Sequence, residues 1–161
     1  MLEKLFGKKS KKGEIVTIQN GKIVPIEEVP DYVFSQKILG DGVAIIPESG
    51  EIYSPVNGTI VSTISSGHAY GIQADEGGEI LVHIGIDTVA LNGDGFRCKV
   101  TQNQRVHVGD LLAEVDLELL KSRGYHTIIV VLLTNGNELK NVKKMTGDGK
   151  AGKTVIITYE K

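Results

Sequence analysis

The chain has 161 residues and a formal net charge of −2, and Cys98 is its single cysteine. This length suits one domain that buries its own core, and the lone cysteine excludes an internal disulfide and a cysteine-rich zinc site. No apolar run approaches the ~20 residues of a membrane-spanning helix, and the N-terminus lacks the apolar core of a secretory signal. These features predict a cytoplasmic protein.

Charge is divided unevenly along the chain. Residues 1–12 hold five lysines and one glutamate, so residues 13–161 carry thirteen basic and nineteen acidic residues, a charge near −6. An acidic domain is not expected to bind nucleic acid, which needs a basic face. On a short helix, Leu2, Leu5 and Phe6 would share one side. We therefore expect a single domain at 13–161 and a basic tail at 1–12, which is either a disordered leader or a weak anchor at anionic lipid.

Short apolar runs separated by glycine predict an all-β fold. The 20 glycines recur between runs rich in Val, Ile and Thr, at the spacing of about ten residues that is typical of a sandwich or barrel of short strands. Residues 14–18 and 21–26 predict two strands paired through the intervening Asn-Gly turn. Asp31 then predicts the cap of a short helix that ends at Gly40.

The rest of the domain continues as strands with two more short helices. Residues 103–116 predict a strand, a turn and a second strand. Asp116 predicts the cap of a helix that ends at Gly124, and a further short helix is expected at residues 137–144. The remaining strands are expected, in chain order, at residues 43–47, 51–64, 68–73, 80–89, 98–102, 127–134 and 154–160.

A repeated turn indicates that the domain is built from duplicated units. Residues 106–112 and 148–155 each place a small turn ending in glycine between two apolar strands, and residues 54–61 are a looser relative. This turn resembles those of lipoyl- and biotinyl-type domains, which are flattened antiparallel β-sandwiches built from such units. A carrier domain of that kind needs a lysine at the exposed tip of a hairpin, and no such lysine is found. The resemblance therefore predicts the sandwich fold, with a few short helices, and not the carrier function.

Two histidines stand out in the middle of the chain. His83 lies within the apolar run at residues 80–89, and Asp87 follows four positions later. A lone buried histidine is most often a core imidazole bonded to the backbone. His68, however, lies in a neighbouring strand-like segment, and the turn at residues 75–78 joins the two segments as a hairpin. We therefore expect both imidazoles on one face of a sheet, where they form a site for chemistry.

Several runs around these histidines resemble the glucose-type enzyme IIA of the bacterial phosphoenolpyruvate-dependent sugar phosphotransferase system. The similarity covers residues 14–161 and is most specific in HIGIDTV, the LNGDGF that follows and the upstream GHA. Other matching runs are VPDYVFSQKILGDGVAIIP, YSPVNGTIVS and VHVGDLLAEVDLELL. The resemblance implies a β-sandwich that accepts a phosphoryl group from the phosphohistidine of HPr and passes it to a cysteine of the enzyme IIB or IIBC component of a sugar permease. It also implies that His83 is phosphorylated and that His68 lies beside it.

The residue types suit phosphoryl transfer. A neutral imidazole is a good nucleophile near pH 7, and a hydrogen bond from its other nitrogen fixes the tautomer. For His83, the resemblance implies that the Gly85 carbonyl receives this bond. His68 would donate a hydrogen bond to the charge that spreads over the phosphoryl oxygens. Ser66, which stands where the family usually has threonine, would orient His68.

A phosphohistidine needs shelter from water and a surface on which partners dock, so we expect an apolar rim around the pair. Asp31 and Asp87 match family positions that meet partner arginines; their alternative roles are a helix cap and a solvated carboxylate at a strand end. The same face would serve regulatory protein targets. Composition alone would place each rim candidate in the core. The candidates are Val33, Phe34, Ile38, Leu39, Ile64, Tyr70, Leu81 and Val89.

Two other functions remain open on the same fold. Lysostaphin-like zinc endopeptidases share this kind of sandwich, and His83 with Asp87 has the spacing of their His-x-x-x-Asp ligand pair. Their third ligand comes from a His-x-His that is absent here, since valines flank His107, so we expect no intrinsic metal or cofactor. His68 and His83 could still bind zinc together with a carboxylate of a partner. The second alternative is a non-catalytic regulatory module. We expect His107 and His126 on the surface.

Overall fold

The computed structural model describes residues 12–161, so residues 1–11 of the expected tail, with Leu2, Leu5 and Phe6, lie outside the described residues. Lys12, the last residue of that tail, instead opens the first strand. The elements are, in chain order, β1 (Lys12–Val16), β2 (Gly21–Pro25), the 3-10 helix η1 (Ile26–Glu28), α2 (Tyr32–Ser35), β3 (Asp41–Pro47), β4 (Glu51–Tyr53), β5 (Gly58–Thr63), β6 (Ala69–Ala74), β7 (Glu79–Ile84), η2 (Thr88–Leu91), β8 (Phe96–Cys98), β9 (Arg105–Val106), β10 (Leu111–Val115), α3 (Leu117–Ser122), β11 (Ile129–Leu133), η3 (Gly136–Glu138), β12 (Lys140–Lys144), β13 (Gly147–Gly149) and β14 (Val155–Glu160).

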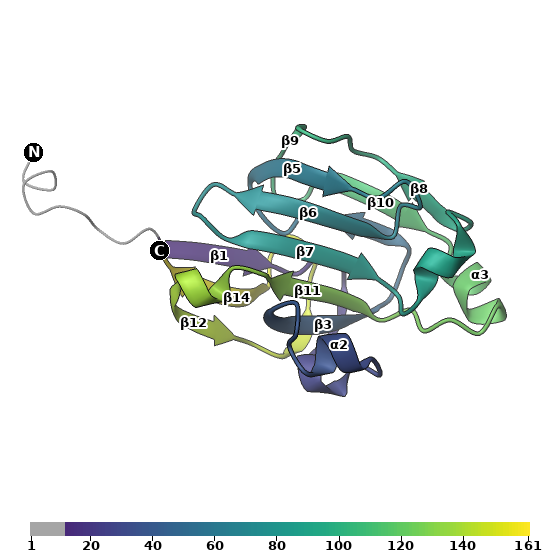
Figure 1. Cartoon of the computed structure of the whole chain (residues 1–161), viewed down its shortest axis with the longest axis horizontal. Helices are drawn as coiled ribbons and strands as arrows, with labels where there is room; N and C mark the ends of the chain where they lie inside the picture. The colour runs from purple at the N-terminus through teal and green to yellow at the C-terminus, as the bar shows by residue number, and fades with distance from the viewer. Residues whose placement is uncertain (1–11) are drawn as a thin grey trace, which may run out of the picture.

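The strands form one large and two small antiparallel sheets (Figure 1). The eight-stranded sheet has the order β13-β2-β3-β11-β7-β6-β5-β9, and the two three-stranded sheets have the orders β1-β14-β12 and β4-β10-β8. Aliphatic side chains from all three sheets, such as Ile15, Ile52 and Val131, are buried in one core. The predicted all-β antiparallel sandwich with a few short helices is confirmed.

The topology repeats in two interleaved units. Strands β4 to β10 form one uninterrupted unit, and strands β1 to β3 with β11 to β14 form the other. Each unit contributes four neighbouring strands to the large sheet, β9-β5-β6-β7 or β13-β2-β3-β11, and one of the small sheets. The similar turns at 106–112 and 148–155 occupy equivalent places, because they lead from β9 to β10 and from β13 to β14. The units meet where β7 pairs with β11.

The central hairpin forms as the sequence predicts. β6 and β7 pair through the turn at residues 75–78, and Ala69 lies directly opposite His83. β7 ends at Ile84 rather than continuing to residue 89. The reason is Gly85, whose left-handed φ of +75° turns the chain away from the strand. The turn brings the segment after β7 back toward the strand end, beside the histidine.

Both predicted helix caps are present, although one helix is shorter than expected. Asp31 accepts two backbone N–H groups at 2.9 and 3.2 Å and begins α2, which covers only four residues. The expected end at Gly40 is wrong, because Lys37 already has a left-handed φ of 60°. Asp116 accepts a backbone N–H at 3.1 Å and begins α3. Local hydrogen bonding from these carboxylates therefore determines where the helices start.

Two predictions are wrong because pairing with a distant strand decides the structure there. β1 and β2 do not pair with each other, because β1 pairs with β14 while β2 pairs with β3 and β13. Between them the side chain of Asn20 accepts the N–H of Ala151 at 2.8 Å, so the chain crosses from one sheet to another instead of forming a hairpin. The strand, turn and strand predicted at residues 103–116 are present as β9 and β10, which lie in different sheets. The helix expected at 137–144 is mostly β12, because pairing with β14 outweighs local helix propensity.

Candidate active site

His83 lies near the end of β7 with one ring nitrogen already engaged. Its Nδ1 is 2.9 Å from the carbonyl oxygen of Gly85. Because a carbonyl oxygen only accepts, Nδ1 carries the hydrogen, and in the neutral ring Nε2 keeps the lone pair. The ring of Phe34, from α2, packs against this imidazole with the ring centroids 4.9 Å apart. The site therefore holds an oriented imidazole with a defined nucleophilic nitrogen.

His68 lies beside His83 and precedes the first residue of β6. The two imidazoles are nearly perpendicular, at 80°, with their ring centroids 5.1 Å apart. Ser66 Oγ lies 2.7 Å from His68 Nδ1, so a hydroxyl fixes one nitrogen of this buried ring. Phe96 contacts the same ring with the centroids 6.3 Å apart. Phe96 was not among the predicted site residues, although it is the last residue of the LNGDGF run that carries the family resemblance.

Burial lowers the pKa of both imidazoles. For His83 burial is the largest cause, and the neighbouring ring of His68 lowers the pKa further. The hydrogen bond to the Gly85 carbonyl and the charges of Asp31 and Asp87 act in the opposite direction, more weakly. For His68 burial alone lowers the pKa. Both rings are therefore neutral at pH 7, which is the state in which an imidazole acts as a nucleophile or donates a hydrogen bond without charge.

We expect acidification to destabilise the fold through these rings. Because the fold lowers both pKa values below the ordinary 6.5, the unfolded chain takes up their protons first as the pH falls. The free energy of unfolding is then highest above about pH 7 and decreases as the pH drops through the folded-state pKa values. Urea unfolding between about pH 7.5 and 5 measures this, and His83→Gln, which cannot be protonated, should show a smaller decrease. An NMR titration of His83 at or above pH 6.5 would contradict the expectation.

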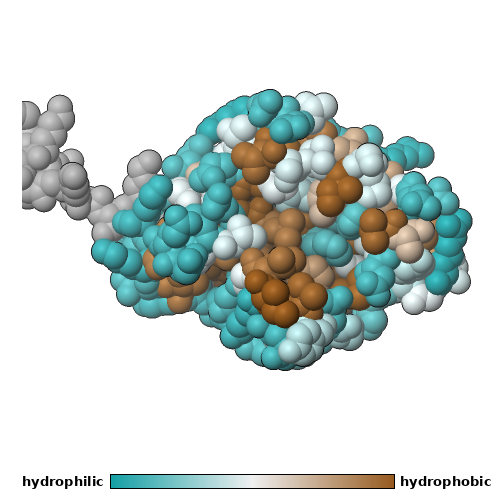
Figure 2. All heavy atoms as spheres, viewed as in Figure 1, coloured by the Kyte–Doolittle hydropathy of each residue, from teal (hydrophilic) through white to brown (hydrophobic). Residues whose placement is uncertain are grey.

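An apolar surface lies over α2 and the neighbouring strands (Figure 2). Leu81 is partly buried and packs on the cluster that holds α2 against the sheet. Phe34 is buried in that cluster, and its ring also contacts His83, so it packs against the imidazole from the protein interior. The rim candidates with exposed side chains are Val33, Ile38, Leu39, Ile64 and Val89. These five residues, with Leu81, are called the apolar rim below.

Tyr70 was predicted for the rim, and the structure corrects this. Its side chain is fully buried, and its hydroxyl donates to the Gly67 carbonyl at 2.9 Å. In the β6–β7 ladder, Tyr70 lies opposite Val82, which is also fully buried. Side chains alternate between the two faces of a strand, so Tyr70 points into the core and not toward His83. Its hydroxyl holds the backbone just before His68.

Asp31 and Asp87 both lie close enough to His83 for their charges to raise its pKa. Asp31 caps α2, so the alternative role proposed for it is present. Asp87 is exposed in the turn after β7 and has a left-handed φ of 59°. Their contact with arginines of partner proteins stays a prediction.

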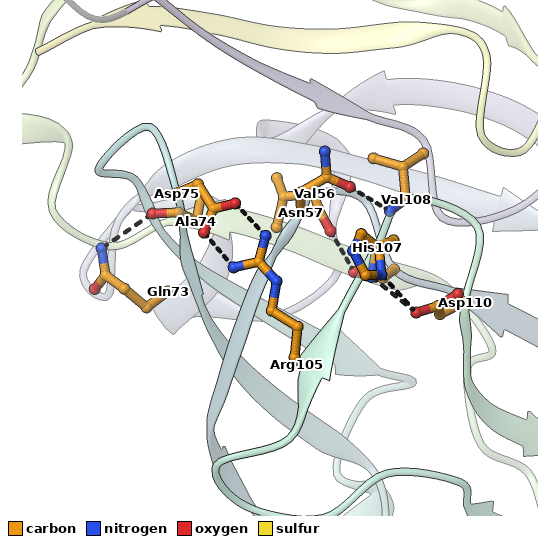
Figure 3. A network of polar contacts seen from close by, with 10 residues as sticks. Val56, Asn57, Gln73, Ala74, Asp75, Arg105, His107, Val108 and Asp110 are labelled. Atoms are coloured by element: carbon orange, nitrogen blue, oxygen red, sulfur yellow. Dashed lines mark hydrogen bonds and ion pairs between the residues drawn. The ribbon is translucent and has the colours of Figure 1, made fainter.

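His107 and His126 are exposed, as expected. His107 belongs to a separate polar network around the β9–β10 turn (Figure 3): its N–H donates to Asp110 at 2.8 Å, and its ring lies 3.7 Å from the same carboxylate. In the same network Arg105 donates two hydrogen bonds to Asp75. These contacts tie β9 to the turn between β6 and β7.

The zinc-endopeptidase alternative needs a group of three protein ligands. Within residues 12–161, no three His, Cys, Asp or Glu side chains are grouped so that they could hold a metal ion. A catalytic zinc uses three protein ligands, so the pairing of His83 with His68 does not supply a zinc endopeptidase site.

Fold and site together define a class of protein: a duplicated antiparallel β-sandwich that places two neutral imidazoles side by side next to an apolar surface. Across the part of the chain that the structure describes, no helix is long and apolar enough to cross a membrane.

Comparison with known proteins gives the family. The model for the phosphoenolpyruvate-dependent sugar phosphotransferase system, EIIA 1, matches residues 13–139. The glucose-specific EIIA component of Buchnera aphidicola subsp. Acyrthosiphon pisum is 46% identical over 149 residues, which cover 92% of each chain. The glucose-specific EIICBA component of Streptococcus pneumoniae serotype 4 is 43% identical over 147 residues, 91% of this chain and 20% of that longer protein. The solved structure of glucose permease IIA from Mycoplasma capricolum has a TM-score of 0.82 at 37% identity and covers 95% of this chain and 97% of that one.

The chain therefore belongs to the EIIA 1 family of the phosphoenolpyruvate-dependent sugar phosphotransferase system. It is a phosphocarrier component of sugar transport, as the resemblance predicted.

Proposed function

We propose that His83 is the residue that carries the phosphoryl group, from the phosphohistidine of HPr to a cysteine of enzyme IIB. The observation that supports this most directly is the 2.9 Å contact from Nδ1 to the Gly85 carbonyl, which leaves the lone pair on Nε2. Nε2 attacks the phosphorus, and the bond between phosphorus and the HPr imidazole breaks with its electron pair returning to that ring. In the second step the IIB thiolate attacks, and the electron pair of the N–P bond returns to Nε2 of His83.

His68 is the proposed partner of the phosphoryl oxygens. When the Ser66 hydroxyl donates to His68 Nδ1, across 2.7 Å, the hydrogen of the neutral ring lies on Nε2 and is available to an acceptor. A loose phosphoryl-transfer transition state spreads charge over the equatorial oxygens, so a fixed donor beside them stabilises it. The nearly perpendicular rings, with centroids 5.1 Å apart, place this donor next to the attacking imidazole.

The proposed partners are HPr, enzyme IIB or IIBC, and regulatory proteins that dock on the same face. A relative that combines the A, B and C components in one chain supports the association with IIB and IIC. The apolar rim would cover the transferring group, and Asp31 and Asp87 at its border would meet partner arginines. The exchange would take place in the cytoplasm, where a free thiol such as Cys98 stays reduced. Zinc would bind His68 and His83 only if a partner added a carboxylate.

Reconstitution tests the proposal. The purified chain is incubated with phosphoenolpyruvate, enzyme I and HPr, and the product is examined by mass spectrometry and peptide mapping. We expect one acid-labile phosphoryl group per chain on the peptide that contains His83, and none when HPr is omitted. A phosphoryl group on another peptide would overturn the assignment of His83.

Residues 1–11 are proposed to add a weak peripheral contact with anionic membranes. They carry four lysines together with Leu2, Leu5 and Phe6, the composition of an interfacial anchor. Deleting them leaves β1 complete, since that strand begins at Lys12. We expect unchanged phosphoryl acceptance from HPr and weaker binding to vesicles that contain anionic lipid, measured by sedimentation at low salt. The matched variant replaces the four lysines with glutamine; equal vesicle binding by all three proteins would show that the tail is not an anchor.

A further inference from the structure

The peptide bond between Ile84 and Gly85 is held on both sides. The Ile84 carbonyl accepts the hydroxyl of Thr88 at 2.5 Å. The Gly85 N–H donates to the Ile128 carbonyl at 2.8 Å. This peptide unit directly precedes the Gly85 carbonyl that receives His83 Nδ1–H, so its orientation controls where that carbonyl points.

Ile84 is also hydrogen-bonded to the backbone of the second histidine, His68. The N–H of Ile84 donates to the His68 carbonyl at 2.7 Å. Ile84 is therefore bonded through its N–H to the backbone that carries His68, and through its C=O to Thr88. Ile84 directly follows His83 in the chain and is hydrogen-bonded to the backbone of His68. A shift of Ile84 would therefore move the two imidazoles relative to each other.

Gly85 has little freedom of its own. Its φ of +75° is left-handed, and a Cβ on it would lie 2.5 Å from Thr88 Cγ2 and 2.9 Å from the His126 carbonyl oxygen. The backbone at Gly85 is thus enclosed by the methyl group of Thr88 on one side and by the segment before β11 on the other. Thr88 contacts this turn twice, with its hydroxyl at Ile84 and with its methyl group at Gly85.

The Thr88 hydroxyl is placed for this role, because its hydrogen bond within residues 12–161 is the one to the Ile84 carbonyl. It is fully buried in η2, and the left-handed φ of 59° at Asp87 folds η2 back over the end of β7. Buried hydroxyls are nearly always hydrogen-bonded. Here the acceptor is the Ile84 carbonyl, one residue before the Gly85 carbonyl that accepts from His83. The Thr88 side chain contacts the Ile84 carbonyl and lies beside Gly85, whereas the imidazole of His83 contacts Phe34, His68 and the Gly85 carbonyl. Its action on His83 is therefore through the backbone.

We propose that Thr88 is a positioning residue for phosphoryl transfer: its hydroxyl fixes the peptide before Gly85, so that the Gly85 carbonyl holds the hydrogen on His83 Nδ1 and leaves the lone pair on Nε2. The inference rests on the proposed role of His83 as the phosphorylated residue. It predicts that removing one hydroxyl, which touches neither imidazole, changes the tautomer of His83 as well as the rate of transfer.

The test compares two substitutions of Thr88. Thr88→Val keeps the shape and a methyl group but leaves the buried Ile84 carbonyl without its donor. Thr88→Ser keeps the hydroxyl and loses the methyl group. In Thr88→Val we expect 15N NMR of the full chain to show His83 as a mixture of tautomers and acceptance from HPr to be about 10-fold to 100-fold slower, as for a misplaced reacting group. Thr88→Ser should keep the Nδ1–H tautomer and most of the rate.

A matched control separates positioning from loss of stability. Thr17 is also fully buried, and its hydroxyl donates to a backbone carbonyl, that of Gln19, at 3.0 Å. Thr17→Val makes the same chemical change without touching Ile84, Gly85 or either imidazole. We expect it to lower the melting temperature and to leave the His83 tautomer and the acceptance rate unchanged.

Several outcomes would overturn the proposal. An unchanged tautomer and rate in Thr88→Val would do so, and so would an equal loss of rate in Thr17→Val. If Thr88→Val does not fold, Thr88→Cys replaces it in both measurements, because a thiol is a weak donor. The tautomer is measured in unphosphorylated protein, so it tests Thr88 even if peptide mapping finds the phosphoryl group elsewhere and the proposed role of His83 fails.

Discussion

Replacing His83 with alanine is expected to abolish phosphoryl acceptance from HPr. The substitution removes Nε2, which holds the lone pair because Nδ1 is bonded to the Gly85 carbonyl. Loss of a nucleophile can cost on the order of 10⁶ in rate, so the label from phosphoenolpyruvate should be undetectable in the variant. Incorporation is measured with enzyme I and HPr in excess, over times at which the unmodified chain is fully labelled.

Two controls make this result specific. The ring of His83 packs on Phe34, so His83→Ala should destabilise the fold by about 1–2 kcal/mol, and its unfolding curve must show that the protein remains folded in the assay. His107→Ala removes an exposed histidine from a separate polar network and should be labelled normally. Labelling of His83→Ala at the normal rate would exclude His83 as the carrier.

Replacing His68 with glutamine is expected to affect the two steps differently: acceptance of the phosphoryl group from HPr and its transfer to enzyme IIB. The glutamine amide keeps a donor of similar reach, and the contact of His68 Nδ1 with Ser66 shows that the native ring is oriented by a hydroxyl. Glutamine cannot become charged or move a proton. Acceptance at His83 should therefore persist, whereas transfer to the IIB cysteine should fall by about 10²–10³, the usual effect of losing a preorganised group at the transition state.

Rapid-quench measurement of each step decides the role of His68. The variant is first loaded from HPr and then mixed with purified IIB, and His126→Gln, in which an exposed histidine is changed, serves as the matched control. Transfer to IIB at the normal rate would mean that His68 takes no part. A complete failure to load would mean that His68 is required for acceptance or is itself the nucleophile.

The site could be predicted largely because its parts are close in sequence. His68 and His83 come from one hairpin, and the turn at residues 75–78 gives that hairpin a local signal. The error at Tyr70 arises at the same place. If His68 belonged to β6, Tyr70 would share its face; instead, β6 begins at Ala69, which lies opposite His83, and Tyr70 faces the core. Sequence alternation cannot show where a strand begins.

The errors in the fold have a different physical origin. The Asn-Gly turn between β1 and β2 has the composition of a hairpin turn, but pairing of β1 with β14 joins residues 139 to 148 positions apart. The segment at 140–144 is polar and lysine-rich, and it becomes a strand only because β14 offers it a partner. A single sequence records local preference and not the free energy of contacts between distant segments. The duplicated topology could be anticipated only from its repeated turns.

The described chain enters and leaves at one end of the sandwich (Figure 1). Lys12 pairs with Glu160, and the hydroxyl of Tyr159 accepts the N–H of Gly78 in the hairpin turn. His83 lies five residues further along β7, roughly 17 Å from that turn at ~3.3 Å per strand residue. A linker attached at this end would leave the histidines uncovered. In a fused chain such as the EIICBA relative, a short flexible tether would hold the domain at about millimolar effective concentration near its acceptor. The same fold can thus act as a separate protein or as a domain tethered to its acceptor, without any change at the reacting atoms.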